Sequence, residues 1–148
     1  MDNPSQALGT AHRTVLNIED SAANVLLVEE LIGRRRDLKV ITAMTGKQGI
    51  ELACARQPDV ILLDINLPDI DGMEVLKILL GTAQTAHIPV IALSSNAFPE
   101  QIEKGMRAGF FAYLTKPFKI DALMENIDEA LRFSSLRPTR SDGSPLEP

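Results

Sequence analysis

The sequence has 148 residues, of which 45% are hydrophobic, so it is long enough for one globular domain with a buried core. Its 15 basic and 20 acidic residues give a formal charge of −5, which opposes direct binding to nucleic acid. The single cysteine, Cys54, cannot form an internal disulfide, and no segment has the pattern of a signal peptide or a membrane span. We therefore expect a cytoplasmic protein without membrane contact.

The chain alternates between apolar runs typical of strands and amphipathic runs typical of helices. Residues 1–13 are polar and aperiodic and predict a flexible leader, residues 14–133 predict one domain, and residues 134–148 predict a flexible tail. The predicted strands are residues 15–18, 38–43, 60–63, 88–93 and 110–114. The predicted helices are about residues 21–35, 45–57, 71–80, 99–108 and 120–133.

This alternation predicts an α/β fold with a doubly wound, five-stranded parallel sheet and five helices. The four apolar residues 60–63 indicate a strand buried on both faces, which is typical of the middle of such a sheet. Lys39 and Thr42 place their strand at an edge. Asn17 is an amide within an apolar strand and needs hydrogen-bond partners that the sequence does not identify.

Chemically active side chains follow the predicted strands at their carboxyl ends, where ligands bind in open α/β sheets. Three carboxylates meeting there repel one another unless a cation lies among them, and ligands made only of oxygen suit Mg²⁺. A lysine and a hydroxyl can hold phosphate oxygens, and an aspartate beside a metal can attack a phosphoryl group. The residues concerned are Glu19, Asp20, Asp64, Ser94 and Lys116.

Most of these residues, and Tyr113 at the end of the last predicted strand, also have an ordinary structural role that the sequence leaves open; Asp64, for example, could be a carboxylate that only solvates a loop. Asp20 could be no more than the N-cap of the first helix, and Ser94 could be no more than a hydroxyl at a strand end. Tyr113 could be a core aromatic, and Lys116 a solvated loop lysine. Their joint placement at one edge of the sheet favours the functional interpretation.

The order and spacing of these residues resemble the receiver domains of two-component response regulators over residues 14–132. The resemblance rests on Ile18-Glu19-Asp20, Leu62-Leu63-Asp64, Pro68, Asp71-Gly72, Ala92-Leu93-Ser94 and residues 113–118. It implies a flavodoxin-like fold with strand order 2-1-3-4-5. This sequence departs from the family in Glu19, where many members have Asp, in Ser94, where Thr is frequent, and in Asn17, where most have an apolar residue.

The resemblance also implies a role for each site residue in a phosphorelay. Asp64 would receive a phosphoryl group from the phosphohistidine of a histidine kinase or a histidine phosphotransfer protein, and Ser94 and Lys116 would hold the phosphoryl oxygens. Mg²⁺, or Mn²⁺, would be bound by Asp20 and Asp64, through water by Glu19, and by the main-chain carbonyl of Asn66.

Signal output is expected to follow from a conformational switch. The resemblance implies that Tyr113 turns inward when Ser94 moves toward the phosphoryl group, and that the Lys116–Pro117 bond is a candidate cis peptide. It also implies a possible homodimer through the face formed by the fourth helix, fifth strand and fifth helix. Only 15 residues follow Phe133, so we expect output by protein contact.

Other functions remain open at this point. A haloacid-dehalogenase-like phosphotransferase or phosphatase needs a second acid two residues after the nucleophile, where this chain has Asn66. A flavin carrier needs a phosphate loop where Glu19 and Asp20 lie, and a receiver-like scaffold works unphosphorylated. We expect no enzymatic turnover beyond self-phosphorylation and slow autodephosphorylation. Residues 96–99 and 109–113 resemble hybrid sensor kinase receivers, so the chain is either a single-domain regulator or such a receiver.

Overall fold

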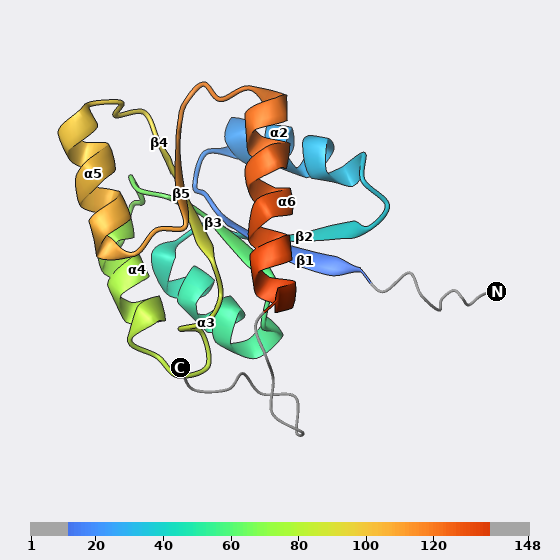
Figure 1. Ribbon diagram of the computed structural model, residues 1–148, viewed down its shortest axis with the longest axis horizontal. Coiled ribbons are helices and arrows are strands. Elements are labelled where there is room, and N and C mark those ends of the chain that lie inside the picture. The colour runs from blue at the N-terminus through green and yellow to red at the C-terminus, as the bar shows by residue number, and fades with distance from the viewer. Residues whose placement is uncertain (1–11, 137–148) are drawn as a thin grey trace.

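The computed structural model describes residues 12–136, and its centre is a parallel sheet with the strand order β2-β1-β3-β4-β5 (Figure 1). The strands are β1 (Arg13–Ile18), β2 (Leu38–Ala43), β3 (Val60–Asp64), β4 (Val90–Ser94) and β5 (Ala112–Thr115). All four strand pairs are parallel, and β2 is an edge strand with Lys39 exposed. The predicted fold class and strand order are confirmed.

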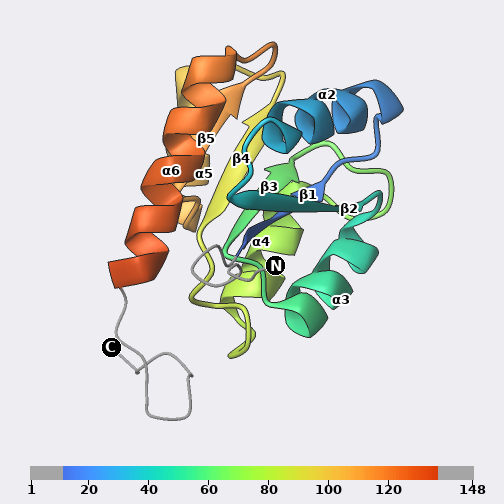
Figure 2. The same ribbon diagram turned by 90° about the vertical axis from the view of Figure 1, so that its right-hand side faces the viewer.

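Within residues 12–136, helices cover both faces of the sheet: four of them connect the strands, and the last helix follows the last strand. They are α2 (Ala22–Gly33), α3 (Gly46–Arg56), α4 (Gly72–Leu80), α5 (Pro99–Ala108) and α6 (Ile120–Leu136). Figure 2 shows α2 and α6 on one side of the sheet and α3 and α4 on the other. In Figure 1, α5 lies beside α4, and it packs on β5. None of the helices within residues 12–136 has the length and apolar content needed to span a membrane.

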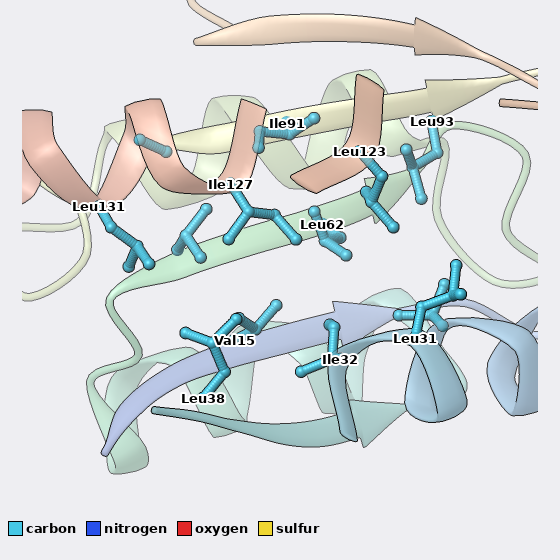
Figure 3. Packing of buried hydrophobic residues seen from close by; sticks show 13 residues of the cluster. Val15, Leu31, Ile32, Leu38, Leu62, Ile91, Leu93, Leu123, Ile127 and Leu131 are labelled. Carbon is cyan, nitrogen blue, oxygen red and sulfur yellow. The ribbon is translucent and has the colours of Figure 1, made fainter. Parts of the chain in front are cut away.

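The core consists of two apolar layers separated by the sheet. Val15, Leu62 and Ile91 face α2 and α6, and Figure 3 shows them among leucines and isoleucines of those helices. Ile61 and Leu63 point to the opposite face, toward α3 and α4. Every residue of β3 is therefore buried, as the apolar run predicted. Each fully buried leucine or isoleucine contributes about 1.5–3 kcal/mol to folding, which holds β3 rigidly at the centre.

Three helices begin at side-chain caps just beyond the carboxyl edge of the sheet. Ser21, Thr45 and Asp71 are the N-caps of α2, α3 and α4, and each side chain accepts a hydrogen bond from a backbone amide two or three residues later. Such a cap stabilises a helix by about 0.5–2 kcal/mol. The caps fix where the loops at this edge end.

Some element boundaries differ from those predicted. β4 begins two residues later, because the amide of Ile88 donates to the carbonyl of Thr85 in a turn and Pro89 has no amide hydrogen. β5 also begins two residues later, at Ala112. The last helix continues to Leu136, since nothing between Phe133 and the next proline breaks a helix. Apart from residues 12–13 and 134–136, the predicted leader and tail lie outside the described residues.

The end of α2 is held by an ion-pair cluster that the sequence did not reveal. Arg34-Arg35-Arg36 indicated a solvated helix end, but α2 ends at Gly33, and Nη2 of Arg35 lies 2.8 Å from Asp37 and 3.0 Å from Asp128 of α6. The hydrogen bond to Asp37 has the largest effect in raising the pKa of Arg35, and the hydrogen bonds to Asp128 have the next largest. Arg35 thus joins α2 to α6.

Asn17 is fully buried in the middle of the sheet, between Thr42 of β2 and Leu62 of β3. Among the described residues, neither its amide oxygen nor its amide nitrogen has a hydrogen-bond partner. A buried polar group in this state costs about 1–3 kcal/mol of stability.

Candidate functional site

The parallel register of the strands brings the predicted site residues to one edge of the sheet. Asp64 at the end of β3 is level with Leu93, and Ser94 at the end of β4 is level with Thr115, which directly precedes Lys116. Ile18 ends β1 beside Leu63, so Glu19 and Asp20 follow at the same edge. Residues as far apart in sequence as Glu19 and Lys116 therefore meet.

Three carboxylates form the acidic part of the site. Glu19, Asp20 and Asp64 each place an oxygen within 4.8 Å of the others; Glu19 and Asp64 are buried and Asp20 is exposed. Because Ser21 is the N-cap of α2, the interpretation of Asp20 as a helix cap is wrong. Three oxygen ligands at this spacing, one open to solvent, fit a hard divalent cation such as Mg²⁺.

Lys116 supplies positive charge between two of these acids. Its Nζ lies 2.9 Å from Oε1 of Glu19 and 3.3 Å from Oδ2 of Asp64. The second oxygen of Glu19 accepts a hydrogen bond from the backbone amide of Ser21. Burial, and then contact with Asp64, raises the pKa of Glu19, whereas Lys116 and the Ser21 amide lower it. One lysine thus only partly offsets the repulsion among the acids.

The loop after β3 forms the open side of the site. Oδ1 of Asp64 accepts a hydrogen bond from the amide of Asn66 at 3.0 Å, and the amide of Gly72 donates to the carbonyl of Ile65 at 2.8 Å. A Cβ atom on Gly72 would lie 2.5 Å from the Cα of Ile65, so only glycine permits this closure. Asp20 and Asn66 line a hollow of about 370 Å³ beside the loop.

Ser94 and Tyr113 are connected through a backbone segment rather than directly. Oγ of Ser94, which is buried, accepts a hydrogen bond from the amide of Asn96 at 3.0 Å. The hydroxyl of Tyr113 donates to the carbonyl of the same Asn96 at 3.2 Å. Sequence reasoning missed this role of Asn96, because its main chain makes both contacts and no side-chain pattern signals them.

The backbone at the end of β5 completes the site. The amide of Lys116 donates to the carbonyl of Ser94 at 2.7 Å, which extends the pairing of β4 with β5 by one residue. The peptide bond between Lys116 and Pro117 is cis. The side chains predicted at the carboxyl edge of the sheet therefore all lie there, and Asn66 lies in the adjoining loop. These side chains are Glu19, Asp20, Asp64, Ser94 and Lys116.

Comparison with known proteins identifies the family. Residues 15–128 match the model of the response regulator receiver domain. The chain is 34% identical over 119 residues to the polar-differentiation response regulator DivK of Brucella ovis, a match that covers 80% of this chain and 96% of DivK.

Solved structures show the same fold. A signal receiver domain from Vibrio parahaemolyticus has a TM-score of 0.78 at 23% identity, over 84% of this chain and 94% of that one. Another similar structure is the receiver domain of a sensor histidine kinase from Pseudomonas aeruginosa, which has a magnesium ion coordinated in its active site cleft. Its TM-score is 0.73 at 29% identity, and the match covers 84% of this chain and 99% of that one. With a family model spanning most of its length and a relative above 30% identity, this chain belongs to the response regulator receiver domain family.

Proposed function

We propose that this domain accepts a phosphoryl group on Asp64 from the phosphohistidine of a histidine kinase or a histidine phosphotransfer protein. The observation that best supports this proposal is the position of Asp64. It is buried at the end of the central strand, its carboxylate lies 3.3 Å from the ammonium of Lys116, and it has an oxygen within 4.8 Å of oxygens of two other acids. An oxygen of Asp64 forms the new bond to phosphorus, the phosphorus–nitrogen bond breaks, and its electron pair returns to the imidazole.

The oxygen cluster supports a bound Mg²⁺ or Mn²⁺. Asp20 and Asp64 would bind it directly, the main-chain carbonyl of Asn66 would be a third ligand, and Glu19 would act through water. An indirect role suits Glu19, because its two oxygens already accept hydrogen bonds from Lys116 and Ser21. A metal bound there would supply positive charge for the phosphoryl oxygens. Ser94 and Lys116 hold the remaining oxygens.

The alternatives are less well supported. A haloacid-dehalogenase-like reaction lacks its second acid, because Asn66 is an exposed amide at the required place. A flavin phosphate after β1 would meet the carboxylates of Glu19 and Asp20. An unphosphorylated scaffold leaves the convergence of Asp64 and Lys116 without a purpose. The domain is thus a signalling phosphoacceptor, active in the cytoplasm, as a single-domain regulator or as a receiver of a hybrid kinase.

The test is Mg²⁺-dependent labelling of the whole chain by acetyl phosphate. We expect the intact mass to increase by one phosphoryl group in Mg²⁺ and to stay unchanged in EDTA, because the acids need the cation before an anionic donor can approach. The added group should be released by hydroxylamine, as for an acyl phosphate. Labelling that is equally strong in EDTA, or that resists hydroxylamine, would contradict the proposal.

Output is proposed to pass from Ser94 to Tyr113 through Asn96. Movement of Ser94 toward a phosphoryl group would shift the Asn96 segment, to which the hydroxyl of Tyr113 is bonded. The ring of Tyr113 lies against α5, where a Cβ on Gly105 would approach it to 3.0 Å. Turning this ring would change the surface of α5, β5 and α6, the face proposed to contact a partner or a second copy of the chain.

We expect Tyr113→Ala to keep labelling of Asp64 close to the parent level while weakening the change in self-association that follows it. A coupling of about 1–3 kcal/mol, typical between linked sites, corresponds to a loss of roughly 5- to 150-fold in the phosphorylation-dependent affinity. Sedimentation velocity with and without acetyl phosphate measures it. Tyr113→Phe, which keeps the ring and loses the hydrogen bond to Asn96, is the matched control. Its phosphorylation-dependent change in self-association should lie between that of the parent and that of Tyr113→Ala. An unchanged response in Tyr113→Ala would move output to another face.

A further inference from the structure

Asp69 lies in the loop between β3 and α4, and both of its carboxylate oxygens bind the first turn of α3. Oδ1 accepts a hydrogen bond from the amide of Gly46 at 2.8 Å, and Oδ2 accepts one from the amide of Lys47 at 3.0 Å. Both hydrogen bonds lower the pKa of Asp69, and the one from the Lys47 amide has the larger effect. The N-cap Thr45 serves the amide of Gln48 instead, so Asp69 accepts from amides that the cap does not reach.

Gly46 shows how closely α3 approaches this loop. It is buried at the start of α3, and a Cβ atom there would lie 2.9 Å from Cγ2 of Val75 and 3.3 Å from Cβ of Ile70. The same atom would lie 3.4 Å from Oδ1 of Asp69. The absence of a side chain at this position therefore lets the loop and the helix meet at hydrogen-bond distance.

The same loop carries Asn66, whose carbonyl is the proposed third metal ligand. The two ends of the loop are held next to β3, one by the hydrogen bond from the Asn66 amide to Asp64 and the other by the hydrogen bond from the Gly72 amide to the Ile65 carbonyl. Asp69 holds the outer part of the loop to a rigid helix. We infer that Asp69 is a positioning residue, which binds no metal itself but fixes the Asn66 carbonyl relative to Asp20 and Asp64.

This inference rests on the proposed metal site and adds a residue that sets its affinity. If the loop were released from α3, metal binding would have to order it, and the affinity would fall although every ligand was still present. Partners that orient metal ligands typically change affinity by 10- to 100-fold when removed. Because Asp69 acts through the loop, we expect the lower end of that range.

The test is calorimetric titration of the full chain with Mg²⁺. Asp69→Ala should raise the dissociation constant roughly tenfold. Gly46→Ala should raise it in the same direction without any change in charge, because the added methyl group pushes α3 and the loop apart. Its control is Gly33→Ala, where the added Cβ meets nothing within 4 Å and the affinity should equal that of the parent.

A second control separates positioning from simple loss of charge. Asp71→Asn removes one charge from the same hollow and keeps a cap for α4, so any weakening it causes should be smaller and should fade at high salt. The effect of Asp69→Ala should persist there. Equal effects of these two variants, or a parent-like affinity in Asp69→Ala, would overturn the inference alone. A parent chain that binds no Mg²⁺ would overturn the proposed metal site as well.

Discussion

Asp64→Asn is expected to take up no phosphoryl group from acetyl phosphate in saturating Mg²⁺, under conditions that label the parent chain. The amide is neutral and lacks the nucleophilic oxygen that the reaction needs. Its side-chain oxygen can still accept the hydrogen bond that the Asn66 amide donates to Asp64 at 3.0 Å, so the loop should keep its shape. Intact mass measures the labelling, and thermal unfolding checks that the variant is folded.

The matched control for this variant is Asp71→Asn. Asp71 is an aspartate of the same loop, but its carboxylate caps α4 by accepting a hydrogen bond from Met73, and asparagine caps a helix equally well. The control should therefore be labelled like the parent. Labelling retained in Asp64→Asn would assign the phosphoryl group to another residue. Labelling lost in both variants would mean that the loop, rather than Asp64, is what the substitutions disturb.

The fold could be predicted from the sequence because its signals are local. The four apolar residues 60–63 specify a strand that is buried wherever it pairs, and the alternation of strands and helices leaves few topologies. The site followed from the same logic, since residues at the carboxyl ends of parallel strands must share an edge. Residues 19, 20, 64, 94 and 116 could thus be grouped before any distance was known.

The contacts that the sequence could not predict depend on packing between distant segments. No sequence pattern connects Asp69 with α3, yet its carboxylate binds the start of that helix more than 20 residues earlier in the chain. Arg35 was assigned to a solvated helix end, yet it pairs with Asp128, 93 residues away. Both side chains are exposed in part and charged, and such residues have many possible partners until the helices are placed.

Mg²⁺ at about 100 times its dissociation constant should raise the melting temperature of the parent by roughly 10 °C, because binding to the folded state alone adds about 2.7 kcal/mol of stability. Asp20→Ala should abolish this rise. Asp20 is the exposed member of the acid cluster, so it is the ligand that an arriving cation meets, and Lys116 is bonded to the other two acids instead.

Without metal, Asp20→Ala should be at least as stable as the parent, because the substitution removes one of three mutually repelling carboxylates and leaves the Ser21 cap of α2 intact. Differential scanning calorimetry in EDTA and in Mg²⁺ measures both effects. Glu103→Ala removes an exposed acid of α5 outside the cluster and should keep the full Mg²⁺ response. If Asp20→Ala responded to Mg²⁺ like the parent, the cation would be bound elsewhere. If the variant were less stable than the parent in EDTA, repulsion among the three carboxylates would not be what Asp20 contributes to the metal-free domain.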